Sequence, residues 1–95
     1  MNEPLIPPDT FISAAMIRAA RGLLNLSQTA LGECLLPKLS RRTISKIETD
    51  APGRPDERRR NVLKAIREAL EGKGIEFLFG DADFVVGVRL RRGFN

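Results

Sequence analysis

Three segments of this chain repeat one helix-start pattern, in which an apolar residue precedes a serine and another apolar residue follows four positions after it. The instances are Ile12-Ser13 with Ile17, Leu26-Ser27 with Leu31, and Leu39-Ser40 with Ile44. Such a serine accepts a hydrogen bond from a free N–H of the first turn, and the two apolar residues can contact each other across it. Each instance opens a segment of helical apolar spacing, so the sequence predicts three consecutive short helices. Met16, Ala30 and Thr43 stand where a reciprocal capping box needs Glu or Gln, so simple serine caps of about 1 kcal/mol each are expected.

The apolar spacing after each serine sets the expected extent of the helices. The first is predicted at about 14–24, the second from 28 to about 35, and the third at 41–48. Asn25 is expected to end the first helix in a left-handed conformation. Pro37 is expected to stop the second, because proline cannot donate the next backbone hydrogen bond.

The second half of the chain changes from helical to alternating apolar spacing. A longer amphipathic helix is predicted from about Asp56 to Gly72. Beyond it, apolar residues alternate through 75–79 and again through 84–90, with the sequence GDAD at 80–83 between the two runs. Two alternating runs joined by a short polar turn predict a β-hairpin with one apolar face. The expected fold class is therefore mainly α, with four to five helices and a C-terminal β-hairpin.

Aromatic residues are concentrated in the predicted hairpin. Four of the five phenylalanines lie there, at positions 77, 79, 84 and 94. An isolated hairpin is marginal in water, and a small helical core needs fewer large rings than this. We interpret the excess as an indication that the hairpin also forms the interface of a homodimer.

Composition excludes several classes of protein. A chain of 95 residues is expected to form one domain. With no His and a single cysteine, Cys34, it lacks the commonest general base and any multi-cysteine metal site, so we expect no enzyme, no cofactor and no metal. Cys34 itself is expected to be a small, semi-buried residue. No apolar run approaches about 20 residues and the N-terminus is acidic and proline-rich, so we expect no membrane span, no signal peptide and a cytoplasmic location.

Basic residues are concentrated in the middle of the chain. The span from Lys38 to Lys64 holds nine of the sixteen basic residues and four of the twelve acids, a net charge of +5 in a chain of net charge +4. A localised basic span is typical of proteins that bind polyanions. Arg58 and Arg59, at the start of the fourth predicted helix, could contact phosphate or simply lie in solvent.

The third predicted helix has two different sides. At about 100° per residue, Ile44 and Ile47 fall on one side, and Arg42, Ser45 and Lys46 fall on the other. A short helix with a thin apolar stripe and a basic outer face can lie on a small core and present cations to the major groove of DNA. This arrangement indicates a DNA-binding helix at residues 40–48.

Two strings of residues carry a resemblance to a known family. The string IRAARGLLNLSQ resembles the first helix and the entry to the second helix in the Cro/CI-type (XRE family) helix-turn-helix regulators. The string SRRTISKIE resembles the recognition helix of the same family. The resemblance implies a lambda-repressor-like DNA-binding domain. It also implies a transcriptional regulator that acts as a homodimer on a palindromic operator in double-stranded DNA.

The resemblance also implies roles for particular residues. Gln28 would meet phosphate or a base edge, and Ser40 and Thr43 would bond phosphate. Arg41, Arg42 and Lys46 would face base edges, beside Ser45 on the same outer side. Arg21 and Glu48 match the family's internal ion pair between the first and third helices. The sequence departs from the family in the segment CLLPKL, which is about two residues longer than the usual turn and has Pro37 in place of glycine.

These interpretations divide the chain into three parts. They are an N-terminal arm (1–12), a helix-turn-helix domain (13–73) and a C-terminal hairpin (74–95) that serves in dimerisation. An alternative function stays open: an antitoxin or anti-activator that keeps this fold but works mainly by binding a protein partner. DNA binding by the isolated chain would discriminate between the two.

Overall fold

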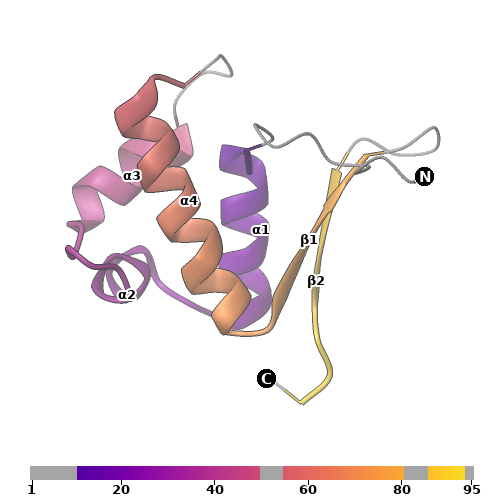
Figure 1. Cartoon of the computed structure of the whole chain (residues 1–95). Coiled ribbons are helices and arrows are strands. Elements are labelled where there is room, and N and C mark those ends of the chain that lie inside the picture. Colours follow the sequence, from indigo (N-terminus) through magenta and orange to yellow (C-terminus); the bar gives the residue numbers. More distant parts are fainter. Residues whose placement is uncertain (1–10, 50–54, 81–85, 94–95) are drawn as a thin grey trace.

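The computed structural model of the chain describes residues 11–49, 55–80 and 86–93, which form four helices followed by a two-stranded antiparallel hairpin (Figure 1). The elements are α1 (Ala14–Leu24), α2 (Gln28–Glu33), α3 (Arg41–Thr49), α4 (Glu57–Gly72), β1 (Ile75–Phe79) and β2 (Val86–Leu90). The prediction of a mainly helical chain that ends in a hairpin is confirmed. Of the predicted arm, residues 1–10 lie outside the described residues, while Phe11 and Ile12 pack with the core.

The three predicted serine caps are present. The Oγ atoms of Ser13, Ser27 and Ser40 accept hydrogen bonds from the backbone N–H groups of Met16, Ala30 and Thr43, at 3.2, 3.0 and 3.2 Å. The expectation that no capping box forms is wrong for α1. There the Sδ atom of Met16 accepts a hydrogen bond from the backbone N–H of Ser13 at 3.5 Å. A thioether is a weak acceptor, and here it takes the place of the Glu or Gln side chain of an ordinary capping box. Asn25 ends α1 at φ 53°, in the left-handed conformation predicted for it.

Helix α2 is shorter than predicted, because it ends at Glu33 and not near Leu35. The carbonyl oxygen of Gly32 accepts hydrogen bonds from the backbone N–H groups of Leu35, at 3.3 Å, and of Leu39, at 3.0 Å. The chain therefore turns back across α2 before it enters α3. The close crossing needs a glycine, since a Cβ atom on Gly32 would lie 2.0 Å from the carbonyl oxygen of Leu39.

The hairpin places its alternating apolar residues on one face, as predicted. Ile75 lies opposite Leu90, Phe77 opposite Val88, and Phe79 opposite Val86. Opposed side chains share one face of the sheet, and five of these six belong to the hydrophobic core or pack against it. Strand β2 contacts α1 and strand β1 contacts α4, so the helices cover the apolar face of the hairpin.

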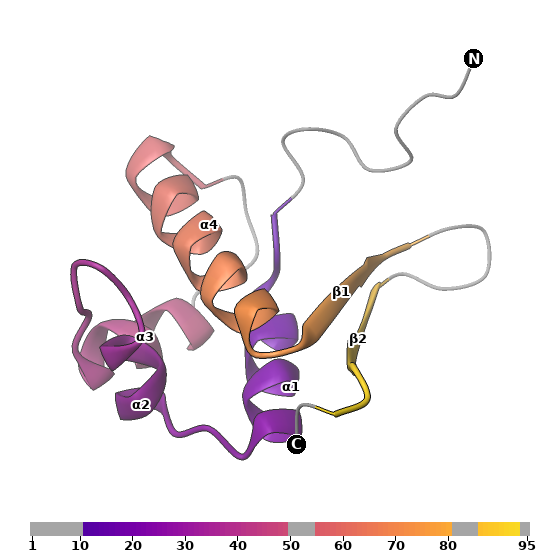
Figure 2. The same cartoon turned by 60° about the horizontal axis from the view of Figure 1, so that its bottom comes forward.

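The arrangement of the elements places the hairpin and α3 on opposite sides of α1 (Figures 1 and 2). The core between them contains side chains from all four helices and from β1. They are Met16, Ile17, Ala20, Leu31, Ile44, Ile47, Leu63, Ile66, Leu70, Ile75 and Phe77, together with Ile12 and Leu35. As a consequence, the hairpin leaves the outer surface of α3 uncovered.

Candidate nucleic-acid interface

Helix α3 has one buried side and one exposed side, as the sequence predicts. Ile44 and Ile47 are 0% and 4% exposed and belong to the core. Arg41, Arg42 and Lys46 are exposed on the other side. The apolar stripe thus attaches the helix to the core, and the cationic side chains project into solvent.

The outer surface of α3 is a shallow, open depression of about 590 Å³. It is lined by Arg41, Arg42, Ser45, Lys46 and Thr49, which include three cations and no acid. The hydroxyl of Thr49 donates to the carbonyl oxygen of Ser45 at 3.0 Å, so this side chain folds back onto the helix. Several cations on one exposed face of a helix, with no acid among the residues that line it, can contact phosphate and the acceptor-rich edges of guanine.

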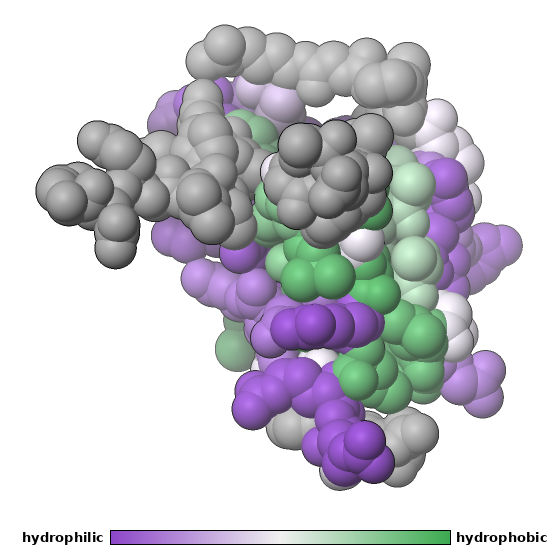
Figure 3. Space-filling view, turned by 90° about the vertical axis from the view of Figure 1, so that its right-hand side faces the viewer, coloured by the Kyte–Doolittle hydropathy of each residue, from purple (hydrophilic) through white to green (hydrophobic). Residues whose placement is uncertain are grey.

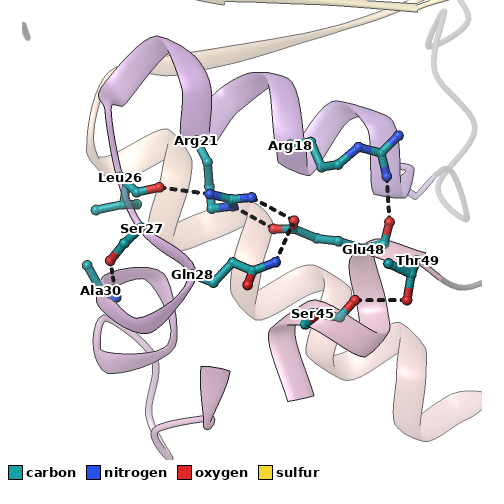
Figure 4. Close-up of polar contacts among 9 residues, drawn as sticks. All are labelled: Arg18, Arg21, Leu26, Ser27, Gln28, Ala30, Ser45, Glu48 and Thr49. Atoms are coloured by element: carbon teal, nitrogen blue, oxygen red, sulfur yellow. Dashed lines mark hydrogen bonds and ion pairs between the residues drawn. The ribbon is translucent and has the colours of Figure 1, made fainter. Parts of the chain in front are cut away.

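The inner end of α3 is attached to α1 by a buried ion pair (Figure 4). The carboxylate of Glu48, which is 1% exposed, accepts two hydrogen bonds from Arg21: Nε to Oε2 at 2.6 Å and Nη2 to Oε1 at 2.7 Å. This is the two-point geometry in which a guanidinium binds a carboxylate most specifically. The pairing of Arg21 with Glu48, expected from the resemblance, is therefore confirmed.

Further hydrogen bonds extend this ion pair to α2 and to the loop before it. Nη1 of Arg21 donates to the carbonyl oxygen of Leu26 at 3.0 Å, and Nε2 of Gln28 donates to Oε1 of Glu48 at 3.1 Å. Arg18, one turn before Arg21 on α1, donates to the backbone carbonyl oxygen of Glu48. The cluster connects α1, α2 and α3 at one point, so it holds the orientation of α3 relative to the other two helices.

The electrostatics of the cluster favour an ionised Glu48. Burial by itself opposes ionisation, but the hydrogen bonds from Arg21 and Gln28 and the charges of Arg21 and Arg18 outweigh it, so the pKa of Glu48 is lowered from its ordinary value. The same hydrogen bond raises the pKa of Arg21. Both shifts favour the charged pair, which is the condition under which a buried carboxylate is tolerated.

The structure places the predicted contact residues in two groups. Arg41, Arg42, Ser45 and Lys46 lie together on the outer surface of α3. The other three lie at helix starts: Gln28, Ser40 and Thr43. The hydroxyls of Ser40 and Thr43 are 3.1 Å apart, and both residues are exposed.

Gln28 takes part in the interior of the protein in a way that the sequence did not predict. It is half-buried, and its amide nitrogen is hydrogen-bonded to Glu48. Gln28 is the first residue of α2, and this position by itself indicates no contact with α3. The partnership with Glu48 depends on how α2 and α3 meet, and no spacing within one helix reports that.

Two other features differ from the sequence-based expectations. Cys34 is exposed rather than semi-buried, and its thiol donates to the carbonyl oxygen of Ala30 at 3.2 Å. The reason is that α2 ends before Cys34, so the residue no longer continues the buried side of that helix. Arg18, for which the sequence predicts no contact, donates a hydrogen bond to the backbone carbonyl oxygen of Glu48 near the C-terminal end of α3.

Among the described residues, no group of three or more His, Cys, Asp or Glu side chains could hold a metal ion. None of the helices in the described ranges combines the length and the apolar character needed to cross a membrane. The chain matches no protein-family model, no curated protein and no solved structure.

Proposed function

We propose that this chain is a sequence-specific DNA-binding transcriptional regulator of the helix-turn-helix type. In this proposal α3 is the recognition helix of a lambda-repressor-like domain, and it enters the major groove. Arg41, Arg42 and Lys46 contact base edges and phosphates there, while Ser40 and Thr43 contact phosphate at the groove rim. The protein acts in the cytoplasm, where it reaches DNA.

One observation carries the proposal: α3 is held rigidly on its inner side and is open and cationic on its outer side. The buried pair of Glu48 and Arg21 fixes the helix at its C-terminal end. Recognition of base edges needs side chains whose backbone is fixed, because a misplaced donor loses the paired hydrogen bonds that distinguish guanine from other bases. A helix with the same cations but with no role beyond covering the surface would not need the buried attachment of Glu48 to Arg21.

We also propose that the active form is a homodimer. The side of the molecule that carries the hairpin presents a patch of hydrophobic side chains next to hydrophilic ones (Figure 3). In the hairpin Val86 is 44% exposed, and Val88 and Leu90 are half-buried. A second copy would cover these side chains and place two α3 helices on successive major grooves, about 34 Å apart.

The phenylalanines of the hairpin give little support to a dimer. Phe77 is buried in the core of its own chain. Phe79 is half-buried, and the guanidinium of Arg67 lies 5.1 Å from its ring centroid. Phe84 and Phe94 lie outside the described residues. The support for a dimer therefore comes from the exposed aliphatic side chains of the hairpin.

The experiment that tests the proposal is selection of bound duplexes from a random DNA pool by the full chain at physiological salt. We expect one enriched motif with two inverted half-sites whose centres are about 10 base pairs, or a multiple of that, apart. The matched control is the variant Arg42→Ala, which should enrich a motif that is degenerate at one position in each half-site. Enrichment of no motif by the wild-type chain would contradict sequence-specific binding.

A further inference from the structure

A groove of about 1540 Å³ lies beside the proposed DNA-binding surface, between α1, α3 and α4. Arg42 and Lys46 of α3 line one wall, Arg58 of α4 lines the opposite wall, and Arg18 of α1 lines a third side. Together with Arg59 of α4, residues from three different helices thus bring five cations around one depression. The three helices that border it meet on the side of α1 away from the hairpin (Figures 1 and 2).

The base of this groove is apolar. Phe11, Leu39 and Val62 line it and are only half-buried, so part of each side chain faces the groove. Beneath them lie Ile47 and Leu63 of the core. Half-exposed apolar side chains that are surrounded by charged ones characterise sites that receive a protein segment.

Among the described residues that line the groove, the cations outnumber the two acids, Glu48 and Asp56. The carboxylate of Glu48 is turned inward and bound by Arg21. Asp56 caps α4, where its Oδ1 accepts a hydrogen bond from the backbone N–H of Arg59 at 2.8 Å. The groove therefore combines positive walls with an apolar base. A nucleic-acid strand would match the walls alone, whereas a peptide that alternates acidic and large apolar side chains would match both.

We propose that this groove binds an acidic amphipathic segment of a partner protein, and that the bound segment excludes DNA from α3. The exclusion follows from shared residues: Arg42, Lys46 and Thr49 line both the groove and the outer surface of α3. A segment that draws Arg42 and Lys46 into the groove removes them from the DNA-binding surface. The exclusion rests on the proposed function, but the binding of the segment does not.

The test begins with a displayed library of random 12-residue peptides, selected on the immobilised full chain without DNA. We expect enrichment of peptides that interleave Asp or Glu with Leu, Ile or Phe. The strongest peptide is then synthesised, together with a version in which each apolar residue is replaced by Ser. Equal affinity of the two versions, or no enrichment, would overturn the proposal, because charge attraction alone would then explain the binding.

Two charge reversals locate the peptide on the protein. Arg58→Glu changes the wall of the groove, and it is tolerated by the fold because Arg58 is exposed near the start of α4, where an acid is favourable. Arg92→Glu makes the same change of charge at an exposed site after β2. We expect Arg58→Glu to weaken peptide binding about tenfold and Arg92→Glu to leave it within about twofold. Equal effects would place the peptide elsewhere and overturn the proposal.

Competition with DNA completes the test. Increasing peptide should displace a labelled duplex carrying the selected motif, without a complex that contains both ligands. A ternary complex would overturn the exclusion. Loss of DNA affinity in Arg58→Glu as large as that in Arg42→Ala would show that a DNA strand occupies the groove. Peptide binding by a chain that selects no DNA motif would refute the proposed function and the exclusion, and would leave the peptide site standing.

Discussion

Glu48 is the residue on which the orientation of α3 depends most directly. Its carboxylate is buried and receives hydrogen bonds from Arg21 and Gln28, which come from two different helices. A buried ion pair does not guarantee a large net stabilisation, because the cost of removing both charges from water offsets much of their attraction. Removal of the charge of Glu48 alone is different, because the partly buried guanidinium of Arg21 then has no counter-charge beside it.

Glu48→Gln is therefore expected to lower the free energy of unfolding by about 2–4 kcal/mol, since it leaves the guanidinium of Arg21 without its counter-charge. Urea denaturation at neutral pH measures the change. Glu76→Gln is the matched control: Glu76 pairs with Arg89 across the exposed hairpin, and its loss should cost less than about 1 kcal/mol. Similar costs for the two substitutions would show that burial of the Glu48 pair has little energetic effect.

The lowered pKa of Glu48 also predicts a pH dependence. The folded chain keeps this carboxyl ionised to lower pH than the unfolded chain does, so its contribution to stability is complete above its ordinary pKa of 4.5 and is lost as the pH falls through the lower folded-state value. Wild-type protein should lose more stability than Glu48→Gln between about pH 5 and about pH 3. If the free energies of unfolding of the two proteins fall in parallel across this pH range, the lowered pKa of Glu48 is contradicted.

Arg42 gives the corresponding prediction for binding. Because its side chain is exposed, Arg42→Ala should leave the unfolding midpoint unchanged. It should weaken binding to the selected operator by about 1–3 kcal/mol and relax the preference at one base pair. Fluorescence anisotropy on the operator and on random duplex measures both effects. An equal loss on the two duplexes would show that Arg42 contacts only phosphate.

At the scale of the elements, the connection between α2 and α3 distinguishes this chain. The segment between these helices crosses α2 at Gly32, where the carbonyl oxygen of Gly32 accepts a hydrogen bond from the backbone N–H of Leu39. Glycine weakens a helix by about 1 kcal/mol relative to alanine. That cost is offset here, because only a residue without a Cβ atom permits the backbone of Leu39 to come this close.

Gly32→Ala is accordingly expected to destabilise the fold by about 2 kcal/mol or more, since its Cβ would overlap a backbone atom that has little freedom to move. Gly22→Ala is the control, because Gly22 is also helical and exposed, with no neighbouring atom within 4 Å of the added Cβ. The Gly22→Ala substitution should raise the free energy of unfolding by up to about 1 kcal/mol. Opposite shifts in thermal unfolding are the expected result, and a stabilising Gly32→Ala would contradict the close crossing.

At the scale of the whole molecule, the hairpin and α3 occupy opposite sides of α1, so the proposed dimer interface and the proposed DNA-binding surface lie on different sides (Figure 1). Val86→Glu is expected to shift the dimer towards monomer without unfolding it, because Val86 is partly exposed and lies outside the core. Sedimentation equilibrium measures the change. Leu36→Glu is the control, since Leu36 is 90% exposed in the connection between α2 and α3. A wild-type chain that is monomeric at all concentrations would refute the dimer.

Local patterns were sufficient for most of the individual elements. Helix α1 lies between the caps Ser13 and Asn25 as predicted, and the hairpin has the predicted apolar face. Helix starts, left-handed caps and strand alternation depend on neighbours within a few residues, so the sequence alone reports them. The two sides of α3 were predictable for the same reason, because the positions of Ile44 and Lys46 around the helix follow from the helical repeat.

Contacts between elements were decided only by the tertiary structure. The hydrogen bond from Gln28 to Glu48, the crossing at Gly32 and the groove between α1, α3 and α4 all join residues that are distant in the sequence. Their geometry depends on the angles and distances at which the helices pack, and these result from the combined packing of the whole core rather than from any one segment. The sequence by itself therefore determined which helix carries the cations, and the packing decided how that helix is held and which other cations lie beside it.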